Sequence, residues 1–186
     1  MKETILGIFE PLAQLNPLLY VLIIAMVPIV ELRGAIPVGI AMGLPWWQVT
    51  GVAMVGSIIP APFIVLFFKK FMDLAREKKW FPKLIGWLDK KFSKAHREFE
   101  AKIDDGKIDA REAKQIKGLE RAKFWGIMIF TGIPLPGTGA WTASGVASII
   151  EMPPKKAVGA VALGCLMAGV IVTIISLLGK TALQGI

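Results

Sequence analysis

The chain has 186 residues, of which 54% are hydrophobic and 19% charged, and its formal net charge at pH 7 is +8. The charge is unevenly spread, because residues 69–123 hold 17 of the 22 Lys and Arg residues and 10 of the 14 Asp and Glu residues. A soluble domain would intersperse charges with its core, so this pattern disfavours one and predicts a membrane protein with one long basic loop. We expect that loop to meet anionic lipid and not nucleic acid.

The first segment, residues 1–16, carries apolar residues at helical spacing with polar residues between them. It is too short to cross a bilayer, so we predict an amphipathic helix at the membrane interface. It lacks a small-residue cleavage site, so we expect no cleavable signal peptide.

Four apolar segments follow, and two of them are interrupted by proline and glycine. The interrupted segments cover residues 17–44 and 124–150, and each precedes an uninterrupted segment of membrane-spanning length, residues 48–68 and 157–179. The basic loop, residues 69–123, separates the two pairs, and residues 180–186 form a tail. The domains therefore divide into a first repeat, 17–68, and a second repeat, 124–179.

The two halves also align residue by residue. Interrupted apolar segments at matching positions of two halves indicate the binding site of a transporter. Pro28 aligns with Pro134 and Gly39 with Gly145, and after a two-residue insertion Pro45 aligns with Pro153, Gly51 with Gly159 and Gly56 with Gly164.

Two topologies fit these segments. Four full crossings would place Lys155 and Lys156 on the membrane face opposite the basic loop, whereas re-entrant hairpins at the interrupted segments would place all of these cations on the cytoplasmic face. The positive-inside rule favours the hairpins. We therefore predict an all-α multi-pass protein of the prokaryotic inner membrane, built from two inverted repeats, each a re-entrant helical hairpin plus a transmembrane helix, with a cytoplasmic helical insertion.

Glu31 and Arg33 are the only formal charges inside the apolar segments. A charge at mid-bilayer costs about 2.5–3.5 kcal/mol, so such residues face a cavity and find a partner. Pro28, Gly34, Pro37 and Gly39 interrupt the first segment, and both charges lie beside the break predicted at Gly34–Pro37. We predict that Glu31 couples transport to a proton or cation and that Arg33 binds an anion or acts as a gate. A purely structural Glu–Arg pair is the alternative.

The interruption of the second half carries several small and polar residues. We expect a half-helix to begin near Thr138 with its hydroxyl as the cap, so that free N–H groups face an anionic group. A tight turn that only serves helix packing is the alternative. The predicted substrate or ion site therefore contains Glu31, Arg33, Gly34, Pro37, Pro134, Pro136, Gly137, Thr138, Gly139, Trp141 and Thr142.

The remaining signals concern packing, metals and enzyme activity. The small residues Ala160, Gly164 and Ala168 predict a close helix contact, either between the two repeats or at the dimer seam of a homo-oligomer. The basic loop predicts an amphipathic helix over 85–103, and residues 104–112 resemble the end of an EF-hand loop without its first ligands. The single cysteine and single histidine are distant in sequence, so we expect no enzyme activity, no metal and no cofactor.

The segments Glu31–Gly39 and Pro134–Thr142 resemble the small multidrug export family of prokaryotic membrane proteins. That family is more remotely similar to the DedA/VTT superfamily, which implies paired re-entrant hairpins and a role in lipid scrambling or undecaprenyl-phosphate recycling. Glu31 matches the acidic residue of the first hairpin in DedA-type proteins. Those proteins also place arginines in the second hairpin, and residues 131–145 contain none.

Three functions follow as hypotheses. The first is export of small amphipathic or cationic compounds by alternating access, with proton coupling through Glu31. The second is a DedA-like flippase or scramblase for lipid or undecaprenyl phosphate, and the third is a membrane scaffold that transports nothing. The expected partners are membrane lipids and a small-molecule or lipid substrate.

Overall fold

The computed structural model describes residues 16–77, 110–135 and 137–184. All regular secondary structure in these ranges is helical, which confirms the predicted all-α class. The amphipathic helices predicted before residue 16 and over 85–103, and the segment 104–109, lie outside the described residues. The helices are α3 Pro17–Met26, α4 Glu31–Ala41, α5 Trp46–Ile58, α6 Pro60–Glu77, α9 Ala110–Gly132, α10 Ala140–Ile149 and α11 Pro154–Gln184.

Among the described residues, two helical rods are long and apolar enough to cross a membrane. One is Trp46–Phe68, with 23 residues and a mean hydropathy of 2.2, and the other is Pro154–Ala182, with 29 residues and a mean hydropathy of 2.6. At 1.5 Å per residue they extend about 34 and 43 Å, against a hydrocarbon core of about 30 Å. The first rod contains the predicted span, residues 48–68, and it has a single turn residue at Ile59, where α5 ends before Pro60 begins α6.

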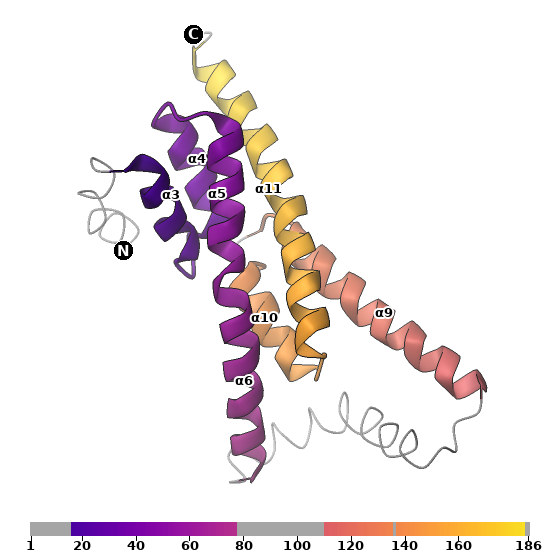
Figure 1. The fold of residues 1–186 in the computed structure, drawn as a ribbon. Coiled ribbons are helices and arrows are strands. Elements are labelled where there is room, and N and C mark those ends of the chain that lie inside the picture. The colour runs from indigo at the N-terminus through magenta and orange to yellow at the C-terminus, as the bar shows by residue number, and fades with distance from the viewer. Residues whose placement is uncertain (1–15, 78–109, 136, 185–186) are drawn as a thin grey trace.

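The other helices of the two interrupted segments are too short to cross. The helices α3, α4 and α10 have 10, 11 and 10 residues, or about 15 Å each. Figure 1 shows α3 and α4 against one half of the long rods, and α10 and the end of α9 against the other half. The predicted boundary between residues 123 and 124 falls inside α9, which joins a charged first part to an apolar second part.

The break of the first interrupted segment lies at Pro28, one of the four predicted positions, and not at Gly34–Pro37. The chain turns at residues 27–30, and Gly34 and Pro37 both lie inside α4. A Cβ at Gly34 would overlap the side chain of Val30, so this glycine lets the turn fold against the helix that follows. Proline is tolerated inside membrane helices because neighbouring groups satisfy the freed carbonyl.

The half-helices α4 and α10 end in the same way. Gly43 and Glu151 each follow a helix C-cap with positive φ, 81° and 55°. After α4, the N–H of Gly43 bonds to Ile40 O at 3.1 Å and that of Leu44 to Gly39 O at 3.2 Å. After α10, the N–H of Glu151 bonds to Ser148 O at 3.1 Å and that of Met152 to Ala147 O at 3.0 Å. This is the Schellman motif, which satisfies carbonyls that a helix end leaves free.

Close contacts between small residues hold the helices together. A Cβ at Gly56 of α5 would overlap the Leu22 carbonyl of α3, and a Cβ at Gly164 of α11 would overlap the Met128 carbonyl and Thr131 of α9. Gly164, the middle residue of the predicted small-residue face, therefore packs against α9 of the same half of the chain. The hydroxyls of Thr50 and Thr173 join α5 to α11 at 2.6 Å.

We expect Gly43→Ala to lower stability by about 1 kcal/mol, because an L side chain disfavours the left-handed region and no neighbour would compensate. The expected fall in Tm is about 2–4 °C. The measurement is thermal unfolding of the purified protein in detergent, reported by a thiol-reactive dye on the buried Cys165.

Gly51→Ala is the matched control, since Gly51 lies inside α5 and a Cβ there would also meet open space. It should leave Tm unchanged or raise it, because alanine is the better helix former. Equal Tm values for the two variants would contradict the left-handed turn after α4.

Candidate functional site

The two interrupted segments meet at Glu31. This residue begins α4 directly after the turn, has φ of 48°, and is 6% exposed. A left-handed conformation costs a non-glycine residue about 1–2 kcal/mol and persists where its surroundings hold it. The surroundings here come from the second half of the chain.

The Glu31 carboxylate lies at the start of α10. Its Oε1 accepts a hydrogen bond from the backbone N–H of Trp141 at 3.3 Å. The N-cap residue of α10 is Gly139, which has no side chain that could accept a hydrogen bond. The Glu31 carboxylate of α4 therefore takes the place of a capping side chain. A Cβ at Gly139 would overlap the carboxylate, so any larger residue at this position would displace the Glu31 side chain from the start of α10.

The side chain of Arg33 extends from α4 to the C-terminal end of α9. Its Nη1 contacts Glu31 Oε2 at 2.6 Å, and its Nη2 donates to the carbonyl oxygens of Thr131 at 3.1 Å and Ile133 at 3.2 Å. Nη2 also donates to Thr138 Oγ1 at 3.1 Å. A cation here satisfies the carbonyls that α9 leaves free, just as the anion satisfies the N-terminus of α10.

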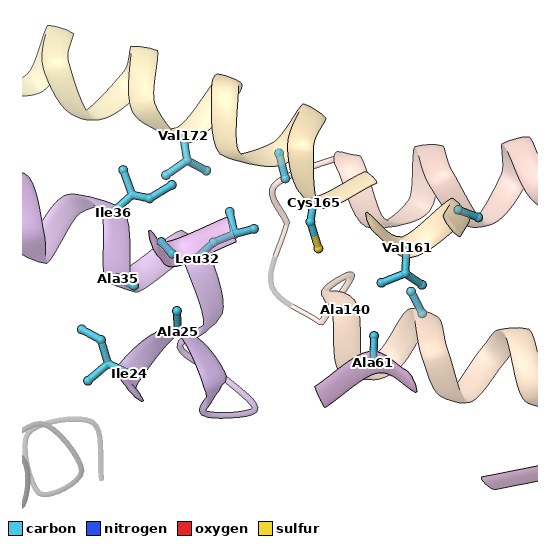
Figure 2. Close-up of a cluster of buried hydrophobic side chains, with 14 of the residues drawn as sticks. Ile24, Ala25, Leu32, Ala35, Ile36, Ala61, Ala140, Val161, Cys165 and Val172 are labelled. Atoms are coloured by element: carbon cyan, nitrogen blue, oxygen red, sulfur yellow. The ribbon is translucent and has the colours of Figure 1, made fainter. Parts of the chain in front are cut away.

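Further hydrogen bonds tie the turn of the first half in place. Ser57 Oγ accepts from the Leu32 N–H at 2.9 Å and donates to the Ala25 carbonyl at 3.1 Å. The Trp141 indole N–H donates to the Met26 carbonyl at 3.2 Å. Figure 2 shows that the side chain of Cys165 points from α11 into the region between Leu32 of α4 and Ala140 of α10.

The structure brings together only part of the predicted site. Glu31, Arg33, Thr138, Gly139 and Trp141 form one contact network. Of the others, Gly34 and Pro37 lie along α4, Pro134 and Gly137 in the turn before α10, and Thr142 on an exposed side of α10, while Pro136 lies outside the described residues.

Two points of the prediction need correction or addition. Thr138 does not cap α10, because its hydroxyl lies 2.7 Å from the Ile133 carbonyl and the helix begins two residues later. Sequence reasoning also missed Ser57 and Thr131. The signal available for Ser57 was a hydroxyl next to Gly56, midway along a span whose other hydroxyl, Thr50, lies near its start.

Two groups of this region lack hydrogen-bond partners within the described residues: the Nε of Arg33 and the hydroxyl of Ser144 are buried and unpaired there. The Arg33 guanidinium therefore retains one N–H donor, at Nε, that has no acceptor among the described residues. The described residues hold no cluster of metal-ligating side chains.

A protein-family model described as "Putative small multi-drug export protein" matches residues 31–171, which include the whole contact network. The chain belongs to this family. No curated protein and no solved structure matches it. The small multi-drug export family and the two long apolar helices together indicate a membrane protein and argue against an enzyme.

We expect Ser57→Ala to destabilise the protein by about 1–3 kcal/mol, because it leaves the Leu32 N–H and the Ala25 carbonyl buried without this partner. Ser176→Ala is the control, since Ser176 bonds only to the Val172 carbonyl of its own helix and should matter little. Thermal unfolding in detergent measures the stability of both variants. Equal Tm values would show that the two hydrogen bonds of Ser57 contribute nothing to the free energy of unfolding.

Proposed function

We propose that this protein exports small amphipathic or cationic compounds by alternating access, at a site between the tips of two re-entrant hairpins. The observation that carries the proposal is the buried Glu31–Arg33 pair, which joins the two halves of the chain at the point where both are interrupted. An intramembrane ion pair is costly and marks ion or substrate pathways in membrane proteins.

The depth of the pair supports a site near the bilayer midplane. Ser57 contacts the turn that carries Glu31, and it lies 11 residues after Trp46 and 11 residues before Phe68, the ends of the first span. Those distances correspond to about 16 Å each along a helix, or about half a bilayer.

Backbone geometry supports the proposal that the halves are inverted repeats. The alignment that places Pro28 on Pro134 also places Glu31 on Gly137, and both have positive φ, 48° and 85°. With the two-residue insertion, Gly43 falls on Glu151, the two left-handed residues after α4 and α10. In Figure 1 the turn between α3 and α4 and the turn before α10 approach the middle of the rods from opposite ends.

The proposed mechanism follows from the two positive charges that Glu31 neutralises, the Arg33 guanidinium and the N-terminus of α10. Protonation of the carboxylate would leave Arg33 and the N-terminus of α10 without their counter-charge, and this would loosen the joint between the halves. A cationic substrate could instead replace Arg33 at the carboxylate. Breaking one side of a buried pair costs about 3–5 kcal/mol, so the joint stays closed until a proton or substrate compensates.

The first test is Glu31→Gln in proteoliposomes. Glutamine keeps the size of the side chain and an acceptor for the Trp141 N–H but cannot exchange a proton, so we expect substrate-dependent proton flux to fall to the level of empty vesicles. Glu77→Gln, which removes a carboxylate outside the apolar segments, should leave the flux unchanged. Normal flux in Glu31→Gln would refute proton coupling through this residue.

A second candidate function rests on the unpaired Nε of Arg33 beside the N-terminus of α10. A guanidinium and free N–H groups together suit a phosphate, so a lipid head group could pass the same site. A scramblase would move labelled lipid without a gradient, and Arg33→Ala would slow it more than Glu31→Gln. If both variants match wild type in both assays, the scaffold hypothesis replaces transport.

The topology has its own test. Single cysteines at Trp47 and Lys155, introduced into a Cys165→Ala background, should react with impermeant reagents from opposite membrane faces if the interrupted segments are re-entrant. Labelling of both positions from one face would restore the four-crossing topology. In Figure 1, α5 begins near the end of the molecule where α11 finishes, as the hairpin arrangement requires.

A further inference from the structure

A cavity opens between α9 and α11, away from the contact network around Glu31. Its volume is about 450 Å³. Two cations, one carboxylate and two aromatic rings line it, and they are Glu120, Arg121, Phe124, Trp125 and Lys156. The two helices are in contact nearer the tip of the second half, where Gly164 packs against Thr131.

The cavity lies at the depth of lipid head groups. Arg121 precedes Thr131 by ten residues along α9, and Lys156 precedes Cys165 by nine residues along α11. Both separations correspond to about 14–15 Å, which is half the thickness of the hydrocarbon core. The sequence of α9 also changes at this level, from charged residues before Phe124 to apolar residues after it.

The charges of the cavity leave one cation available. Lys156 forms a salt bridge with Glu120, whereas no carboxylate of the described residues is in contact with the Arg121 guanidinium. Lys123 is engaged elsewhere, because its Nζ donates to the Ile150 carbonyl at 2.9 Å. Burial lowers the pKa of Lys123, and the charges of Glu151 and Glu120 oppose that effect. The cavity thus has net positive charge at its polar end.

The apolar wall suits the upper part of a lipid. Trp125 is 54% exposed and lies next to Phe124, with the two rings edge to face at 5.9 Å. Tryptophan is enriched where a membrane protein meets the head groups, since its ring is apolar and its N–H is polar. Basic pockets between helices on the cytoplasmic side are known to hold anionic head groups.

We propose that this cavity binds the head group of an anionic phospholipid. Arg121 and Lys156 hold the phosphate, and Phe124 and Trp125 contact the glycerol and the first part of the acyl chains. A phosphate between the cations competes with Glu120 for Lys156. The site requires only that the chain lies in a membrane, so it does not depend on whether the protein transports anything.

Fluorescence quenching tests the site in the full-length protein. The protein is reconstituted in phosphatidylcholine vesicles with increasing fractions of brominated phosphatidylglycerol, whose bromines quench nearby tryptophans. The chain has 6 Trp residues, so Trp125→Phe identifies the part of the signal that comes from the cavity. Brominated phosphatidylcholine at the same fractions gives the quenching expected without head-group selectivity.

We expect Trp125 to be quenched by brominated phosphatidylglycerol at fractions where brominated phosphatidylcholine has little effect. Arg121→Ala and Lys156→Ala should each raise the fraction needed for half-maximal quenching about fivefold, the usual effect of one basic residue near an anionic surface. Lys155→Ala is the matched control, because it removes the same charge from the neighbouring residue outside the cavity, and it should stay within about twofold of wild type.

Three results would overturn the proposal. Arg121→Ala and Lys156→Ala could behave like Lys155→Ala, or the two brominated lipids could quench Trp125 equally. Inorganic phosphate at millimolar concentration could also abolish the selectivity, which would make this a site for free phosphate. Unfolding measured through Cys165 verifies that each variant is folded, and Arg121→Gln replaces Arg121→Ala if the latter is not.

Discussion

The structure depends on placing two opposite charges where two helices end inside an apolar environment. A helix end leaves backbone N–H or C=O groups without partners, and no water is available at bilayer depth to satisfy them. Glu31 meets the N-terminus of α10 and Arg33 meets the C-terminus of α9, while the two side chains also pair with each other. Each charge is therefore opposed both by its partner and by a helix dipole of opposite sign, which reduces the cost of burying it.

The same logic explains why the halves hold each other in place. The Trp141 indole of the second half donates a hydrogen bond to the last carbonyl of α3. The Ser57 hydroxyl of the first span bonds to a carbonyl before the turn and to an N–H after it. Neither interrupted segment is complete without atoms from elsewhere in the chain. This mutual dependence is what the proposed alternating-access mechanism would have to break and re-form.

Much of this architecture can be predicted from the sequence because bilayer solvation imposes a coarse pattern. Block charges, two apolar stretches of spanning length and two lone charges sufficed to predict the all-helical class, the spans and the key pair. The sequence offered four residues that could break the first segment, Pro28, Gly34, Pro37 and Gly39, and could not decide among them. Pro37 disrupts a helix only if nothing satisfies the freed carbonyl, and this depends on packing, which local sequence does not encode. Ser57 was missed for the same reason, since a serine in a helix can bond to its own preceding turn.

The two tips meet at the ion pair with very different kinds of atoms. The first tip contributes charged side chains, whereas the second contributes main-chain groups together with the Thr138 hydroxyl. Main-chain groups are present whatever the side chain is, so most positions of the second tip are free to vary without altering the electrostatics of the junction. Gly139 is the exception for steric reasons. The two tips are therefore constrained differently, because the identity of its charged side chains fixes the first and the path of its backbone fixes the second.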